Sequence, residues 1–166
     1  TYYVHELMKW LQAPYYVGLL SAASVYGASH QRAMTTQVVT TNRNVRAQGK
    51  NPHLNFIVAP CVPNHLLVQR NGEMSVVRYS SPELTAVDLV QYSQHVGGYQ
   101  RVATVLAELL DEVDMSKMAQ VVPYTTTATI QRLGAIMENV LLEQEKAERL
   151  FQILSDAGIT RKSIRM

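Results

Sequence analysis

Cysteine is almost absent from this chain of 166 residues, and long apolar runs are missing altogether. The single cysteine, Cys61, excludes an internal disulfide and any cluster of thiolate metal ligands, and it favours a reducing compartment, so we expect a cytoplasmic protein. No apolar run is long enough to span a membrane, and the chain does not open with a leader of basic and then apolar residues. We therefore expect no membrane contact. The chain starts at Thr1 inside an apparent helix, and we therefore expect a fragment of a longer protein.

The sequence motifs of common active sites are also missing. The five histidines never fall at the short spacings that place two metal ligands on one helical face, and no HExxH motif occurs. Neither a nucleophile elbow nor a phosphate-binding or dinucleotide-binding glycine pattern is present. We expect no metal, no cofactor and no catalysis, and an enzyme would need a site assembled from residues that look structural. Cys61, between two prolines at the end of an apolar strand, is interpreted as a small buried hydrophobic residue.

Acidic residues are scarce in the first half only. Residues 1–82 carry seven Lys or Arg and two acids, whereas residues 83–166 carry eight and eleven. Between residues 30 and 78 there is one acid, Glu73, among six cations, namely Arg32, Arg43, Arg46, Lys50, Arg70 and Arg78. Such a basic stretch indicates an anionic partner, although loop arginines are often only solubilising. No base-reading motif accompanies it.

The residues that are present predict an α+β fold, with a small, mainly antiparallel or mixed sheet in the N-terminal half, packed by helices, and a helical C-terminal half. Two early helices, the second over residues 16–28 with Gly27 as its stop, precede four strands over residues 36–41, 54–59, 65–70 and 74–79. Asn71-Gly72 predicts a hairpin with a type I′ turn. Residues 42–53 are predicted to be an exposed loop carrying Arg43, Arg46 and Lys50.

From Ser81-Pro82-Glu83 onward the pattern is helical, because Ser caps, Pro suits the first turn and Glu complements the positive helix end. The sequence predicts helices over about residues 83–94, 99–112, 115–122, 126–142 and 143–157. We therefore divide one domain, residues 1–166, into a helix-helix-sheet part (1–80), a helical part (81–158) and a basic tail (159–166).

Asp88 stands on an apolar helix face, where a carboxylate is costly unless it is paired. No second carboxylate or base follows at a spacing that would indicate catalysis. We therefore interpret Asp88 as a structural anchor for a backbone amide or for Arg132. The acids at 108, 111, 112 and 114 are interpreted as a solvated helix surface.

Two blocks resemble a known family. The run PYYVGLLSAASVYGASHQ (residues 14–31) with QVVT (37–40) is one block. SPELTAVDLV (81–90), Gly97-Gly98, VATVLAEL (102–109) and QRLG (131–134) form the other, in the same order and spacing. Together they resemble the AbiEi-type antitoxins of type IV toxin–antitoxin systems, specifically the C-terminal domain, over about residues 2–142.

This resemblance implies a bacterial autorepressor of an abortive-infection operon, with a winged-helix DNA-binding domain preceding the part seen here. It also implies antagonism of a nucleotidyltransferase-like toxin without a stable complex, and binding of operator DNA by the full-length protein.

The resemblance supplies no base-reading residues, so the predicted sites rest on charge. We expect the loop trio Arg43, Arg46 and Lys50 to contact DNA phosphates first, and Arg32, Arg70 and Arg78 second. The alternative function is a protein-interaction or scaffolding domain that docks a partner on the acidic helices of residues 100–114.

Overall fold

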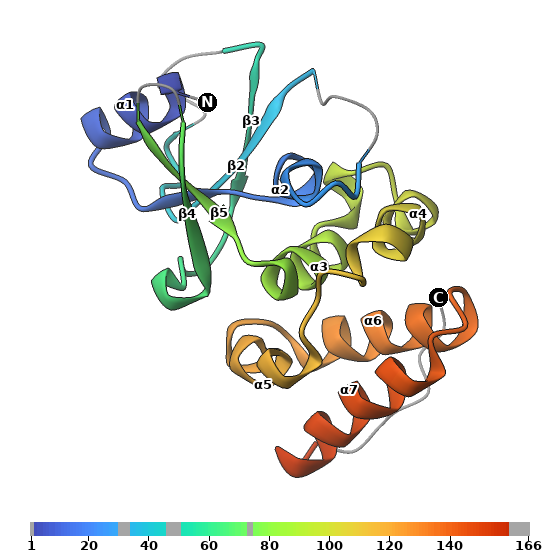
Figure 1. The fold of residues 1–166 in the computed structure, drawn as a ribbon. Coiled ribbons are helices and arrows are strands. Elements are labelled where there is room, and N and C mark those ends of the chain that lie inside the picture. Colours follow the sequence, from blue (N-terminus) through green and yellow to red (C-terminus); the bar gives the residue numbers. More distant parts are fainter. Residues whose placement is uncertain (1, 30–33, 46–50, 73–74, 160–166) are drawn as a thin grey trace.

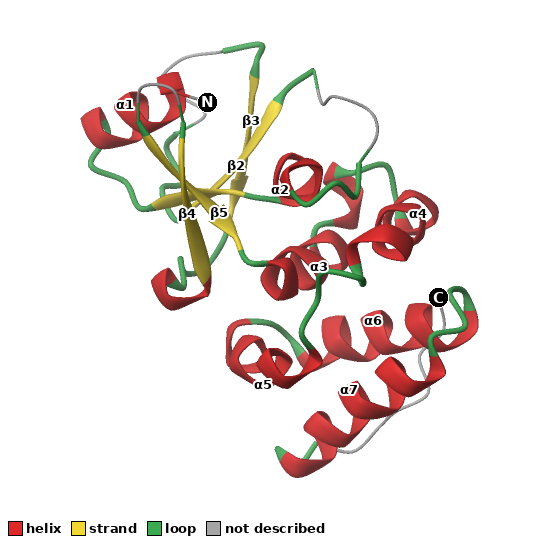
Figure 2. Ribbon diagram, viewed as in Figure 1, coloured by secondary structure: helices red, strands yellow, loops and turns green. Residues whose placement is uncertain are grey.

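The computed structural model describes residues 2–29, 34–45, 51–72 and 75–159. A five-stranded mixed sheet occupies the N-terminal half and the C-terminal half is helical, so the α+β prediction is confirmed. Figure 2 shows the strands grouped at one end of the molecule and the last helices of the chain at the other end. No helix among the described residues is long and apolar enough to cross a lipid bilayer.

The sheet has the strand order β3-β2-β1-β5-β4. Its members are β1 (Tyr15–Val17), β2 (Thr36–Thr40), β3 (Leu54–Val58), β4 (Leu67–Asn71) and β5 (Val76–Ser80). β1 pairs antiparallel with β2 and parallel with β5, β2 pairs parallel with β3, and β4 pairs antiparallel with β5. The four predicted strands all occur, within two residues of the predicted ends.

The central strand, β1, was not predicted. The second helix, expected over residues 16–28, is α2 (Leu19–Val25), and the residues before it form a strand that is buried throughout. Three residues are too few for a recognisable alternation, and only the pairing with β2 and β5 makes them a strand. Leu19 makes the turn into α2 with a φ of 54°, and Gly27 ends the helix with a φ of 76°, as predicted.

The hairpin of β4 and β5 is confirmed, but its predicted turn is wrong. Asn71 pairs with Val76, so the connection has four residues, and the Gly72 N–H donates to the Ser75 carbonyl across 2.7 Å. Neither Asn71 nor Gly72 has the positive φ that a type I′ turn requires. The four-residue connection therefore joins the two strands without a type I′ turn.

Helices cover the sheet on both faces. Figure 1 shows α1 (Tyr2–Trp10) on one side and α2 with α3 (Pro82–Gln91) on the other. Beyond α3 follow α4 (Tyr99–Leu109), α5 (Met118–Val121), α6 (Thr127–Asn139) and α7 (Gln144–Asp156). Four short 3-10 helices complete the described elements: η1 (Asn64–Leu66), η2 (Ser93–His95), η3 (Met115–Lys117) and η4 (Val122–Tyr124).

The helix cap predicted at Ser81 is present, and the structure adds a second cap at Thr126. The Ser81 hydroxyl accepts from the Leu84 N–H across 3.3 Å, with Pro82 in the first turn of α3. In the same way the Thr126 hydroxyl accepts from the Thr129 N–H across 3.2 Å at the start of α6. These bonds satisfy N–H groups that have no partner inside the helix. Because the capping side chain is close in the sequence, the start of such a helix can be predicted from local residues.

Two clusters of buried side chains hold the fold together. The larger joins the α2 face of the sheet to every helix from α3 to α7, with Tyr16, Ile57, Leu89, Leu106 and Leu133 among its most buried members. The smaller lies under α1 and contains Val4, Met8, Tyr15, Val38, Val45 and Phe56. Alternate residues of β1 and β2 therefore enter different clusters, as the pleat of a strand requires.

Candidate functional site

Arg43 occupies an exposed turn directly after β2. The Asn42 side-chain oxygen accepts from the Asn44 N–H across 2.9 Å, which closes a small turn with Arg43 at its centre. Val45, two residues on, is buried with Val4 and Met8 in the cluster under α1. The turn is thereby held against the α1 side of the sheet, while the Arg43 side chain is exposed to water.

Arg70 and Arg78 belong to the hairpin strands but lie on opposite faces of the sheet. Arg70 pairs with Val77, whereas Arg78 pairs with Gln69. Directly opposed residues of an antiparallel pair share a face, and consecutive residues alternate, so the two arginines point to opposite sides. They do not form one cationic surface.

Arg70 is held against the ring of Tyr26, the residue that ends α2. Its guanidinium carbon lies 5.5 Å from the centre of the Tyr26 ring, within the range of a cation–π contact. The Tyr26 hydroxyl donates to the Ser80 carbonyl across 2.7 Å, which fixes the ring. Burial raises the pKa of Tyr26 to about 12, and the positive charge of Arg70 partly opposes that rise. Arg70 therefore has a packing role in addition to its charge.

The charge of Arg78 acts on Tyr15. Burial raises the pKa of Tyr15, and the positive charge of Arg78 counteracts part of the increase. The Tyr15 hydroxyl is also hydrogen-bonded to the Nδ1 atom of His5 in α1, across 2.8 Å. Among the described residues up to 82, the charged side chains are Lys9, Arg43, Arg70 and Arg78 against Glu6.

The described cations placed on the α1 side are Arg43, in the turn held by Val45, and Lys9, an exposed residue in the last turn of α1. Lys9 was not predicted as a site residue, since it lies outside the basic stretch of the sequence. Arg32, Arg46 and Lys50 lie outside the described residues, so their predicted roles stay predictions.

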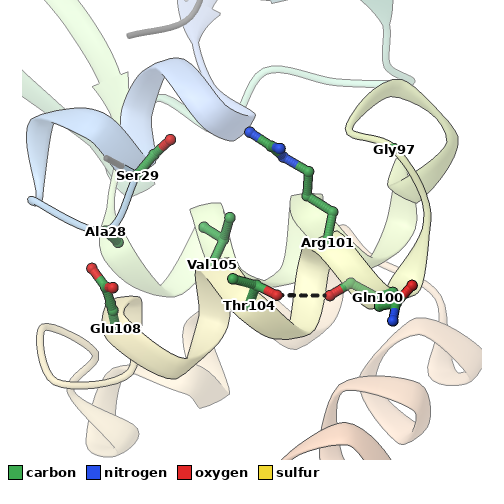
Figure 3. Close-up of a pocket in the computed structure, with 8 residues that line it drawn as sticks. All are labelled: Ala28, Ser29, Gly97, Gln100, Arg101, Thr104, Val105 and Glu108. Atoms are coloured by element: carbon green, nitrogen blue, oxygen red, sulfur yellow. Dashed lines mark hydrogen bonds between the residues drawn. The ribbon is translucent and has the colours of Figure 1, made fainter. Parts of the chain in front are cut away.

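A pocket of about 490 Å³ lies between α4 and the segment that follows α2. Figure 3 shows its lining residues, which are Ala28, Ser29, Gly97, Gln100, Arg101, Thr104, Val105 and Glu108. The α4 residues follow the spacing of one helical face, with Arg101 and Glu108 two turns apart. One cation and one anion leave no net formal charge, so this pocket adds nothing to an anion-binding surface. No sequence motif indicated this pocket.

Asp88 is an anchor, but its partner differs from the two that were expected. The residue is 4% exposed, and one carboxylate oxygen accepts from the Tyr16 hydroxyl across 2.6 Å. Burial raises the pKa of Asp88 to about 7, and the hydrogen bond from Tyr16 opposes part of that rise. The bond ties α3 to the central strand. A residue 72 positions away could not be identified from local spacing.

Cys61 is exposed, so the prediction of a buried hydrophobic side chain is wrong. β3 ends at Val58, and the prolines carry Cys61 into the surface connection that leads to η1. The acids Glu108, Asp111, Glu112 and Asp114 are all exposed, as predicted. No group of three or more His, Cys, Asp or Glu side chains within the described residues is placed to hold a metal ion.

Comparison with known proteins gives a family and a fold. Residues 16–139 match the family model of the AbiEi antitoxin C-terminal domain. No curated protein matches the sequence. The crystal structure of the RV2827C protein from Mycobacterium tuberculosis is similar with a TM-score of 0.66 and 14% sequence identity, over 98% of this chain and 58% of that chain. At this identity the likeness shows the fold alone, and the present chain spans little more than half of that protein's length.

Proposed function

The chain belongs to the family of AbiEi antitoxin C-terminal domains, and on this premise we propose that it serves as antitoxin and autorepressor of a type IV toxin–antitoxin operon. An antitoxin role in a toxin–antitoxin system is the part that the family itself supports. Our proposal adds that this domain carries the antitoxin activity, acts in the cytoplasm by binding rather than by catalysis, and antagonises a nucleotidyltransferase-like toxin without a stable complex.

The single observation that carries the proposal is the extent of the family match. Residues 16–139 include the sheet apart from Tyr15 and reach the end of α6, so the match covers the strands and most of the helical half. It also includes the buried pair Tyr16 and Asp88, which joins these two parts.

Auxiliary contacts with DNA phosphates are the finer part of the proposal. The arginine at the turn after β2, Arg43, is exposed and held in place by the small cluster under α1. Lys9, in the last turn of α1, belongs to the same side of the sheet. A surface of this kind would position the full-length protein on operator DNA without reading the base sequence. The six cations of the basic stretch remain the candidate contacts, with Arg43, Arg46 and Lys50 first.

Growth rescue tests the antitoxin proposal. The toxin gene of the same operon is induced in cells that also express the full-length protein, the chain of residues 1–166, or the chain with Leu106→Asp. Leu106 is fully buried, so a carboxylate there unfolds the domain and provides the inactive control. We expect growth to be restored by the first two proteins and not by the third.

Two results would contradict the proposal. If the soluble, folded chain of residues 1–166 fails to restore growth while the full-length protein succeeds, the domain does not carry the antitoxin activity. If the toxin copurifies with the chain in a stable complex, the antagonism is direct rather than indirect.

A further inference from the structure

An apolar groove runs along α4 on the side away from the Arg101 pocket. Its volume is about 480 Å³, and its apolar lining consists of Tyr99, Ala103 and Ala107 from α4 with Ile136, Val140 and Leu141 from α6 and the residues after it. Gln100 and Thr104 line it as well and also border the Arg101 pocket, so they form the ridge between the two.

Large apolar side chains at the groove are exposed to water. Tyr99 is 39% exposed, Val140 is 53% exposed, and Leu142, directly after the lining residue Leu141, is 72% exposed. Leu142 also has a φ of 56°, a left-handed conformation that is unfavourable for a leucine. The connection between α6 and α7 therefore presents a leucine to solvent at a backbone cost. Such strained, exposed positions are typical of binding surfaces.

The shape of the groove fits a helix. Tyr99, Ala103 and Ala107 are spaced by four residues, so they form one stripe along α4, about 12 Å long. Alanine side chains at two of the three positions let the backbone of a partner approach closely. A stripe of this length accepts about two turns of a helix that places apolar residues at i, i+3, i+4 and i+7.

The charges near the groove indicate which residues a partner should carry beside its apolar face. Residues 99–159 contain nine acids and five bases, and two of the acids, Glu108 in α4 and Asp111 in the turn after α4, are exposed. We propose that this groove binds an amphipathic helix of a partner protein, with its apolar face against the Ala103 and Ala107 stripe and with lysine or arginine on its flanks. The region coincides with residues 100–114, which the acid content alone indicated as a docking surface. The proposal does not depend on the antitoxin function.

A synthetic probe tests the groove directly. The probe is a fluorescein-labelled helical peptide of about 15 residues, with leucines at i, i+3, i+4 and i+7 and lysines on the flanks, titrated against the purified chain by fluorescence anisotropy. We expect saturable binding that is weakened at least about tenfold by Ala107→Arg, because arginine fills the stripe and repels the lysines.

The matched control is Ala119→Arg, an exposed alanine of α5 that does not line the groove. We expect it to bind the peptide like the wild type. Leu142→Asn provides a second groove variant, because asparagine tolerates the left-handed backbone while removing the exposed apolar side chain. We expect weaker binding with an unchanged melting temperature.

Other results overturn the proposal. One is equal binding of a peptide with the leucines spread around the helix, and another is equal binding of a peptide with glutamates in place of lysines. Unchanged affinity in both groove variants would also overturn it. A rise in peptide affinity of about tenfold on deletion of residues 160–166 would mean that the chain's own basic tail competes for the groove. An oligomer that Ala107→Arg converts to a monomer would identify a second copy as the occupant.

Discussion

At the scale of single residues, Asp88 shows how burial and pairing combine. Its side chain lies among the apolar residues of α3 and accepts one hydrogen bond, from the Tyr16 hydroxyl. In this setting the neutral carboxylic acid is favoured, and the pKa rises from 3.8 to about 7. The folded protein therefore binds a proton more tightly than the unfolded chain between these two values.

This difference gives a definite pH dependence of stability. Because the folded state holds the extra proton, we expect the free energy of unfolding to fall as the pH rises from about 4 through about 7, by roughly 1.4 kcal/mol for each unit of pKa shift. Asp88→Asn removes the titrating group and keeps an acceptor for Tyr16. We expect this variant to lose most of the pH dependence and to be more stable than the wild type at pH 8. Urea unfolding at pH 5 and pH 8 measures both.

Tyr16→Phe is the companion variant, since it removes the donor and leaves the carboxylate of Asp88 without its bond. We expect a larger loss of stability at pH 8 than at pH 5, because the charged carboxylate of Asp88 is destabilised more than the neutral acid when the hydrogen bond is removed. A pH dependence that persists in Asp88→Asn would show that another group titrates. A folded Asp88→Asn variant that fails in growth rescue would show that Asp88 has a functional role beyond its anchor role.

At the scale of elements, the contact of α6 with α7 depends on the absence of a side chain at Gly134. A Cβ atom there would lie 2.6 Å from the Cε1 and Cζ atoms of Phe151. Gly134 is buried within α6, and the Phe151 ring packs against the larger core. Glycine in a helix is normally unfavourable, so its presence is explained by the close approach of the two helices.

We therefore expect Gly134→Ala to lower the free energy of unfolding by about 1–3 kcal/mol, as overpacking of a core does. In a Phe151→Ala background the same change meets no ring. There it should be neutral, or stabilising by up to about 1 kcal/mol through helix propensity. Denaturant unfolding of the four proteins gives the coupling energy. Equal costs of Gly134→Ala in both backgrounds would contradict the packing explanation.

At the scale of the whole molecule, the described cations of the basic stretch do not share one face of the sheet. Arg70 is held by Tyr26 and lies on the opposite face of the sheet from Arg78, while Arg43 lies in the turn packed under α1. If DNA phosphates approach the α1 side, the loop trio and Arg70 will contribute differently, although a count of charges treats them alike. This separation changes how the basic stretch should be tested.

A salt titration of operator binding by the full-length protein provides that test. Each lost phosphate contact reduces the slope of log affinity against log salt by about 0.9. We expect the neutralised variant R43Q/R46Q/K50Q to lose up to about three such contacts, and Arg70→Gln to lose less than one. The control K117Q/R149Q removes two exposed cations of the acidic half and should leave the slope unchanged.

If the loop variant binds DNA with the wild-type affinity and slope, the proposed phosphate contacts are absent. If Arg70→Gln reduces the slope as strongly as the loop variant does, the DNA contacts Arg70 instead of the loop alone.

Local signals in the sequence determined the helices, the four longer strands and the fold class. Caps such as Ser81, stops such as Gly27 and runs of β-branched residues act within a few residues, so they can be read without knowledge of the rest. The surface position of the acids of α4 and of the segment after it was predictable for the same reason.

Only the tertiary structure decided which distant groups meet. β1 is a strand because β2 and β5 flank it, and Asp88 is anchored because Tyr16 lies opposite. The register of β4 with β5 sends Arg70 and Arg78 to opposite faces. Pairing, register and helix contact depend on residues far apart in the chain, and a one-residue change of register would have exchanged the two faces. Residue types alone therefore determined the basic stretch, while the fold decided which of its described cations share a surface.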